Sequence, residues 1–340
     1  MRKYLLPEKG QFYKANLHCH STVSDGKWTP EEIKKNYVEK GYSVVAYTDH
    51  NVMIDHSELT DENFLALRGY ELDVGQKEPE FPNASKKTCH MCFVALEPDN
   101  DRQVCWHREK HFGGNAKNYR HLAKFDESLP DYERVYSGEG VSDMMRIGRE
   151  NGFFVTYNHP AWSLETSREY TNYEGMHAME ICNYGCYEEG YEDYVPMAYD
   201  EILRSGKRIY CISTDDNHNR GDEPAHDSFG GFTMIKAEKL EYRTITSAME
   251  RGDFYASMGP EIYELYYEDG KVTVKCSEAA DISICFGVRR ARKCYNSDGT
   301  PLTEATFEVR EDSIYFRITV TDPQGRHANT RAYFLDELQD

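Results

Sequence analysis

Residues 16–26 read Asn16-Leu17-His18-Cys19-His20-Ser21-Thr22-Val23-Ser24-Asp25-Gly26 and are the most informative part of the chain. Two histidines one residue apart on a strand point to the same side, because side chains alternate between the two faces. His18 and His20 can therefore reach one metal ion, and Asp25 offers an oxygen ligand on the following turn. Imidazole and carboxylate ligands suit zinc, manganese or ferrous iron, and the choice among these stays open. An exposed strand can carry such a pair by chance, so the prediction depends on matching fragments downstream.

Length and charge limit the function classes. With 340 residues the chain can bury a barrel-sized core and a smaller second one. The formal net charge of −19 argues against a broad surface for long nucleic acid or for an anionic membrane. A small anionic substrate stays compatible with this charge, because bound divalent cations make a pocket locally positive.

The sequence predicts a cytoplasmic protein. Residues 1–7 lack the apolar core of a signal peptide, and no apolar run reaches the roughly 18 residues of a membrane span. Ten cysteines are scattered along the chain. Cys89 and Cys92 form a C-x-x-C pair, but no second pair completes a zinc knuckle. We therefore expect buried free thiols and a reducing compartment.

Apolar runs alternate with helix signals as far as residue 257. Thr29-Pro30-Glu31-Glu32 predicts a helix start, with a capping threonine, proline at the first position and acids in the first turn, and Gly41 predicts its end. Most of the runs end in polar, ligand-type residues, which is typical of an α/β barrel with its site at the carboxyl ends of the strands. The expected strands are 12–17, 43–47, 64–72, 88–96, 153–157, 179–183, 208–213 and 254–255; further helices are expected at about 142–151, 195–204 and 243–250.

Two segments depart from this alternation. Residues 97–137 are rich in charged and aromatic residues and predict either a cap or lid insertion beside the site or a disordered surface excursion. After Gly259-Pro260, short alternating runs separated by turn residues predict a small antiparallel β-sandwich. The expected domains are therefore a barrel with its insertion at 1–258 and a β-sandwich at 259–340.

The chain resembles the PHP (polymerase and histidinol phosphatase) family of metal-dependent phosphoesterases. The resemblance covers roughly residues 12–257 and implies a distorted (β/α)7 barrel that holds three divalent metal ions. It is carried, in order, by His18-x-His20 with Asp25-Gly26, Thr48-Asp49-His50, Glu71, His90, Asn158-His159-Pro160 and Asp216-Asn217-His218.

The resemblance also implies a division of the ligands among three ions. Glu71 would bridge the first two ions, and Asp49 would support the ligands as a hydrogen-bond acceptor. Asp215 precedes Asp216 and is the alternative ligand, but only Asp216 forms Asp-x-His with His218. The implied sets are His18, His20, Asp216 and Glu71 for the first ion; Glu71, His90 and His159 for the second; and Asp25, His50 and His218 for the third.

The predicted reaction is hydrolysis of a phosphate ester by a hydroxide that bridges two metal ions. Glu71 and Asp216 would act in catalysis by positioning this hydroxide. The expected substrate is a small phosphomonoester or a nucleotide, with a short oligonucleotide as an alternative; no membrane or long nucleic acid partner is expected. Candidate substrate-binding residues are Lys27, Arg120, Asn158 and Glu180, with His121, Arg146 and Asn183 as further candidates; Glu180 could equally serve a structural hydrogen bond.

Two other function classes stay open. Amidohydrolases also begin a barrel with His-x-His, but they typically bridge their metals with a modified lysine, and here Glu71 occupies that place. A non-catalytic, metal-loaded binding module would show missing ligands, whereas all nine expected positions are filled. Cleavage of p-nitrophenyl phosphate, and not of amides or lactones, would separate the phosphoesterase from the amidohydrolase.

Overall fold

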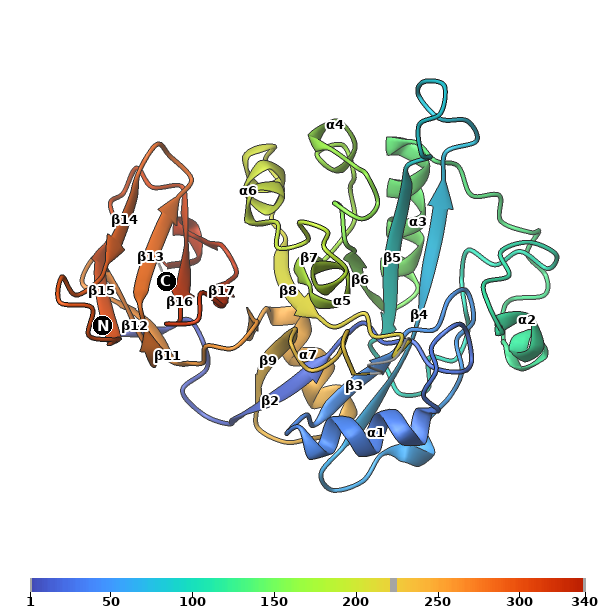
Figure 1. The fold of residues 1–340 in the computed structure, drawn as a ribbon, viewed down its shortest axis with the longest axis horizontal. Helices are drawn as coiled ribbons and strands as arrows, with labels where there is room; N and C mark the ends of the chain where they lie inside the picture. The colour runs from blue at the N-terminus through green and yellow to red at the C-terminus, as the bar shows by residue number, and fades with distance from the viewer. Residues whose placement is uncertain (1, 221–224, 339–340) are drawn as a thin grey trace.

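A computed structural model describes residues 2–220 and 225–338 (Figure 1). None of the helices in these ranges is long and apolar enough to cross a membrane. The α-helices are α1 (Pro30–Glu39), α2 (Ala116–Tyr119), α3 (Gly138–Glu150), α4 (Ser167–Tyr170), α5 (Tyr184–Glu188), α6 (Pro196–Arg204) and α7 (Tyr242–Arg251), with 3-10 turns η1 (Ser57–Leu59), η2 (Arg120–Leu122) and η3 (Leu335–Leu338).

Most strands belong to one large sheet. Its order is β14 (Ala291–Cys294), β13 (Asp281–Phe286), β16 (Tyr315–Thr321), β17 (His327–Thr330), β10 (Phe254–Ser257), β9 (Phe232–Ala237), β2 (Gln11–Asn16), β3 (Val44–Tyr47), β4 (Leu65–Gly75), β5 (Thr88–Ala95), β6 (Phe153–Tyr157), β7 (Ala178–Asn183) and β8 (Tyr210–Thr214), with β18 (Tyr333–Phe334) beside β16. A smaller sheet has the order β1 (Lys3–Tyr4), β11 (Ile262–Glu268), β12 (Lys271–Ala279) and β15 (Leu302–Glu308).

The large sheet is mixed rather than wholly parallel. β2, β3 and β4 run parallel, as do β6, β7 and β8. β5 runs antiparallel to both of its neighbours, because residues 76–87 return the chain directly from β4 without a helix. The structure therefore has a mixed α/β fold, and the closed (β/α)7 barrel is not confirmed: no ladder joins β8 to β2 or β9 within the described ranges.

Backbone hydrogen bonds nevertheless connect the loops that follow β2 and β8. The amide of Asp216 donates to the carbonyl of His18 at 3.0 Å, and the amide of His20 donates to the carbonyl of Asn217 at 3.1 Å. These two hydrogen bonds hold the loops against each other. Both loops carry residues that the sequence predicts as ligands.

The first helix follows its sequence signals closely. The Thr29 side chain accepts from the Glu32 amide, and the Glu32 side chain accepts from the Thr29 amide, which completes a capping box. Gly41 ends the turn with φ of +79°, a conformation that glycine adopts without a side-chain clash. The next strand, β3, begins three residues later and carries His50 to the site.

The C-terminal strands gather at one end of the molecule, on the left of Figure 1, together with the N-terminal strand β1. They pair antiparallel, and a buried core that includes Leu265, Val274 and Ile318 lies among them. A buried Arg317–Asp200 pair, with Nε–Oδ1 at 2.7 Å and Nη2–Oδ2 at 2.9 Å, ties β16 to α6. The large sheet therefore runs from the ligand-bearing strands into the C-terminal strands without a break.

Candidate metal centre

The nine predicted ligands come from six different strands or the loops that follow them, and the structure brings them together. His18 and His20 follow β2, and their Nε2 atoms lie 3.0 Å apart. Glu71 lies within β4 and is 1% exposed. The others follow in chain order: Asp25 in the loop after β2, His50 after β3, His90 on β5, His159 after β6, and Asp216 and His218 after β8.

The innermost group has the dimensions of a metal site. Asp216 Oδ1 lies 3.2 Å from His18 Nε2 and 3.0 Å from His20 Nε2. Glu71 Oε1 lies 3.3 Å from His18 Nε2, and Glu71 Oε2 lies 3.4 Å from His20 Nε2. Ligands about 2.0 Å from a tetrahedral ion stand roughly 3.3 Å from each other. These four side chains can therefore surround one cation.

Glu71 also faces a second group of imidazoles. Its Oε1 lies 3.0 Å from His90 Nδ1 and 3.3 Å from His159 Nε2. The Cys92 thiol belongs to a further close group with His18 and Glu71, and the sequence analysis did not single it out as a ligand. Because His90 and Cys92 are two residues apart on β5, they share one face of that strand.

The third group is more open. Asp25 Oδ1 lies 3.4 Å from His218 Nε2, 3.7 Å from His50 Nε2 and 3.8 Å from His20 Nδ1. His50 also places Nδ1 2.9 Å from Glu71 Oε2. His20 and His50 thus each lie between two groups, so the geometry permits more than one division of the ligands among ions, and the division implied by the resemblance stays a prediction.

Charge and burial fit divalent cations. Burial alone disfavours ionised carboxyls, yet His18 and the neighbouring imidazoles hold the pKa of Glu71 and of Asp216 well below its usual range. Burial opposes protonation of His50 and His159, but the nearby carboxylates, with Glu71 foremost, raise both pKa values to about 9. Glu71 Oε2 and Asp216 Oδ1 are buried and lie close to imidazole nitrogens, of His50 at 2.9 Å and of His20 at 3.0 Å, which are not aligned to donate a hydrogen bond to them. Buried anionic oxygens without a donor are costly unless a cation satisfies them.

The backbone at the site is constrained. His159 has φ of +27° and Asp216 has φ of +51°, both in the left-handed region that side chains other than glycine rarely adopt. Such conformations cost about 1–3 kcal/mol and cluster at functional sites. Two of the predicted ligands are therefore held in orientations that the surrounding structure imposes.

Glu180 organises the ligands from behind. It accepts from His18 Nδ1 at 2.8 Å, from the Thr214 hydroxyl at 2.6 Å and from the His159 amide at 2.9 Å. A donor at Nδ1 leaves the lone pair at Nε2 of His18 free to bind a metal. Asp49, which the resemblance implied for this role, instead accepts from the amides and hydroxyls of Ser21 and Ser24 and so fixes the turn before Asp25.

The two adjacent aspartates have different environments. Asp215 is fully buried and accepts from the Tyr37 hydroxyl and from the amides of residues 229–231 at 2.8–3.0 Å. Burial raises the pKa of Asp215 to about 6. Asp216 points instead at His18 and His20, so the geometry matches the choice of Asp216 as the ligand.

The predicted substrate-binding residues are placed unequally. Asn158 lies in the cluster and donates to Glu71 Oε1 at 3.2 Å. The side chain of Lys27 is exposed, although its backbone amide donates to the backbone carbonyl of His218 at 2.8 Å. Arg120 lies within the insertion, with its guanidinium 4.1 Å from the ring centroids of Trp106 and of Phe112.

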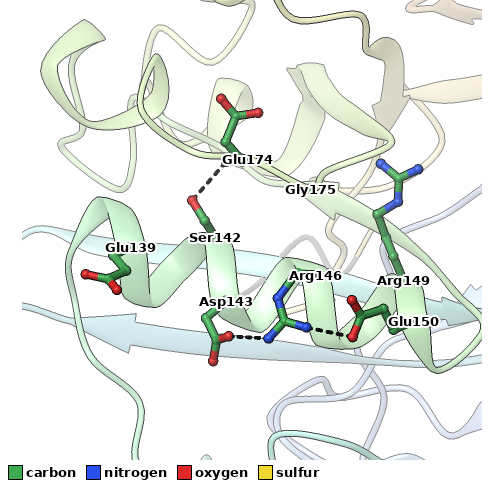
Figure 2. Close-up of a pocket in the computed structure, with 8 residues that line it drawn as sticks. All are labelled: Glu139, Ser142, Asp143, Arg146, Arg149, Glu150, Glu174 and Gly175. Carbon is green, nitrogen blue, oxygen red and sulfur yellow. Dashed lines mark hydrogen bonds and ion pairs between the residues drawn. The ribbon is translucent and has the colours of Figure 1, made fainter.

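The remaining candidates lie away from the cluster or serve it structurally. Arg146 pairs with Asp143 and Glu150 on the exposed side of α3, as Figure 2 shows. His121 is exposed within the insertion. Asn183 donates to Asp216 Oδ2 at 3.0 Å and so positions that carboxylate.

Arg220 and Trp162 line the same cavity of about 280 Å³ as Glu71 and the predicted ligand histidines. Neither residue was predicted from the sequence. The Arg220 guanidinium pairs with the carboxylate of Asp25. Trp162 places its ring edge-on to His90 and His159, with centroids 5.2 and 5.0 Å apart. The spacing Asp216-x-His218-x-Arg220 was the available signal for the arginine, because alternate residues share a face.

The insertion contacts the third group directly. The Asn115 amide donates to the Ser24 carbonyl at 2.5 Å. A Cβ at Gly114 would overlap that carbonyl and lie 2.8 Å from the Cβ of Asp25, while one at Gly113 would lie 3.2 Å from the Cβ of His50. Residues 113–115 therefore form one wall of the site.

Comparison with known proteins gives one family and several partial likenesses. A model of the PHP domain family matches residues 16–204, more than half of the chain. An error-prone DNA polymerase of Cutibacterium acnes is 31% identical over 96 residues, and the DNA polymerase/3'-5' exonuclease PolX of Bacillus subtilis is 34% identical over 87 residues. These matches cover 26% and 20% of the chain but only 8% and 15% of those relatives. Among solved structures, the chain is similar to a two-domain protein of Bacteroides vulgatus that contains a predicted PHP-like metal-dependent phosphoesterase. The alignment covers 98% of this chain and 97% of that protein's chain, at 15% identity and a TM-score of 0.44.

Proposed function

The chain belongs to the PHP domain family, and on that premise we propose that it is a metal-dependent phosphoesterase that hydrolyses a small phosphomonoester or a nucleotide. The single observation that supports this best is the convergence of nine ligand-type side chains around two buried carboxylate oxygens that lack hydrogen-bond donors. The proposal includes three divalent ions, of zinc, manganese or iron, with Glu71 shared between the first two.

Each protein group has a definite task in this proposal. Divalent ions bound in the cluster supply a nucleophile at neutral pH by lowering the pKa of water, and they neutralise charge on the phosphoryl oxygens. Glu71 and Asp216 position them, and Glu180 keeps His18 in the tautomer that binds through Nε2. Trp162 limits water on the side of His90 and His159. Arg220 lies at the cavity where a phosphate would enter.

The architecture of this proposal is an incomplete barrel over about residues 1–258, with residues 97–137 as a cap and residues 259–340 as a β-sandwich that shares the large sheet. The hydrogen bonds between the loops after β2 and β8 support the first part, and the contact of Gly114 with Asp25 supports the second. All ten cysteines are free, which supports a reducing, cytoplasmic setting. We expect a small phosphorylated substrate and neither a membrane nor a long nucleic acid as partner.

A Glu71→Gln substitution tests the proposal. Glutamine keeps the volume but removes the shared negative charge, so phosphatase activity should fall by more than about a hundredfold, since even outer partners of metal ligands contribute 10–100-fold. Activity would be measured on p-nitrophenyl phosphate, nucleotides and sugar phosphates, with metal content determined on the same samples. Glu174→Gln, at an exposed residue away from the cluster, is the matched control.

Wild-type turnover by the Glu71→Gln protein would refute the proposal. Hydrolysis of amides or lactones, without cleavage of any phosphate ester, would favour the amidohydrolase alternative instead. Tight metal binding with no hydrolysis of either panel would favour a binding module.

A further inference from the structure

A second cavity, of about 580 Å³, lies where the end of α1, strands β2 and β9 and the C-terminal strands meet. It shares no lining residue with the cavity of the metal centre. Three cations, Lys14, Lys40 and Arg326, line it, and Glu261 is the one carboxylate among its described lining residues. The lining residues thus carry more positive than negative charge, in a chain whose formal net charge is −19.

The two lysines face aromatic rings. Lys14 Nζ lies 4.0 Å from the ring centroid of Tyr42 and 4.3 Å from that of Phe232, and Lys40 Nζ lies 5.6 Å from the Phe229 ring. Neither lysine forms an ion pair with any residue in the described ranges, whereas Arg326 pairs with Asp322 at 2.7 Å. Lys14 is half-buried and Lys40 is exposed, and a bound anion would add a favourable charge interaction with both.

Burial and nearby charges both act on the pKa of Lys14. Burial lowers this pKa, the charges of Asp215 and Glu261 raise it, and the charge of Lys40 lowers it. An anion placed between them would stabilise the charged form of both.

The aromatic wall of the cavity is preformed. Asp215 accepts from the amides of Phe229 at 2.9 Å and Gly230 at 3.0 Å, which fixes the loop before β9. Phe229 and Tyr184 line the cavity as half-buried rings. Rigid aromatic side chains beside convergent charges are typical of small-molecule sites, which favour boundaries such as this one.

We propose that this cavity binds a phosphorylated small molecule with a planar ring, of the nucleoside monophosphate class, independently of the metal centre. Lys14 and Lys40 contact the phosphate through charge-assisted hydrogen bonds. The ring of the ligand packs against Phe229 and Tyr184. The bound molecule thereby contacts both the sheet that carries the metal centre and the C-terminal segments, because Gly259 and Arg326 also line the cavity.

Calorimetric titration with the methylene phosphonate analogue of AMP, which a phosphoesterase cannot hydrolyse, tests the proposal. Wild type and Glu71→Gln should bind it at this cavity with the same Kd, because Glu71 lies in the other cavity. Lys14→Gln and Lys40→Gln should each weaken that Kd at least tenfold. Lys34→Gln is the matched control: its Nζ lies 5.6 Å from the Phe64 ring, and neither residue lines this cavity.

Binding that is unchanged in both Lys14→Gln and Lys40→Gln would overturn the proposal, as would the absence of binding in wild type. Loss of all binding in Glu71→Gln would place the phosphonate at the metal centre and overturn it as well. Lys40 is exposed, so Lys40→Gln gives a result even where Lys14→Gln disturbs folding. The outcome is independent of the hydrolysis test, because the analogue reports binding alone.

Discussion

Glu180 shows how much a single buried carboxylate controls at this site. It is 1% exposed and receives hydrogen bonds from His18 Nδ1, the Thr214 hydroxyl and the His159 amide. All of these partners donate, as does the side-chain amide of Asn183 at 2.9 Å, so a side chain that accepts only is matched to them. The orientation of two predicted ligands therefore depends on a residue that would not contact a metal.

Glu180→Gln should weaken metal binding about 10- to 100-fold, the usual effect of removing a partner of a ligand histidine. The new amide must turn one donor toward groups that already donate, which disturbs His18 or His159. Affinity would be measured by competition with a chelator of known strength. Glu165→Gln is a buried control, because Glu165 accepts from the hydroxyls of Tyr136 and Tyr157 at 2.8 and 2.7 Å rather than from a ligand. Equal metal affinity in the Glu180→Gln protein and wild type would contradict this role.

At the scale of elements, the insertion between β5 and α3 is part of the site rather than an appendage. Its segment 113–115 lies against the loop that follows β2, and the Asn115 side chain also donates to the Thr22 carbonyl at 3.2 Å. Gly114 has φ of +51° and no room for a side chain. The position of Asp25 thus depends on how this insertion packs.

Gly114→Ala should reduce phosphatase activity about tenfold or more, because the added methyl must displace either the insertion or the turn that carries Asp25. Gly270→Ala is the matched control: its φ is +74°, so it pays the same backbone strain, but no atom lies within 4 Å of the new Cβ. Activity on p-nitrophenyl phosphate and the midpoint of thermal unfolding would be measured for both. If both variants lose similar stability but only Gly114→Ala loses activity, residues 113–115 form a wall of the site. Equal activities of the two variants would contradict this.

At the scale of the whole molecule, the proposed ions would connect strands that no ladder joins. The ligand set comes from β2, β3, β4, β5, β6 and β8 or the loops after them. Between β2 and β8 the described residues supply side-chain packing, the bond from the Asp215 amide to Asn16 Oδ1 and the isolated bridge between Cys19 and Asn217, but no ladder. Metal binding should therefore contribute to folding as well as to catalysis.

Removal of metal by a chelator should lower the midpoint of thermal unfolding by several degrees. A ligand present at 1,000 times its Kd stabilises the folded state by about 4 kcal/mol, and the buried carboxylates lose their cations when it is removed. The measurement is a thermal melt with and without chelator, followed by re-addition of zinc, manganese or iron. The Glu71→Gln protein is the control and should respond less. A chelator that leaves the wild-type midpoint unchanged would contradict a structural contribution of the ions.

The sequence itself predicted the local elements and the set of candidate ligands. Thr29 caps the helix as predicted, and the Nε2 atoms of His18 and His20 converge because alternate residues on an extended segment share a face. The resemblance to the PHP family is confirmed by the match over residues 16–204, although Asp216 and His218 lie beyond that match. These features depend on spacings of a few residues, which the chain encodes directly.

Only the tertiary structure decided the features that depend on distant pairings. The reversal of β5, the strand β9 that the sequence analysis missed, and the pairing of β1 with β11 all follow from which edges meet. The same holds for His20 and His50, which each lie between two ligand groups, and for Arg220, whose partner Asp25 is 195 residues away. Periodicity specifies which side of an element is buried or polar, but the choice of neighbour is set by packing over the whole chain, which no local pattern contains.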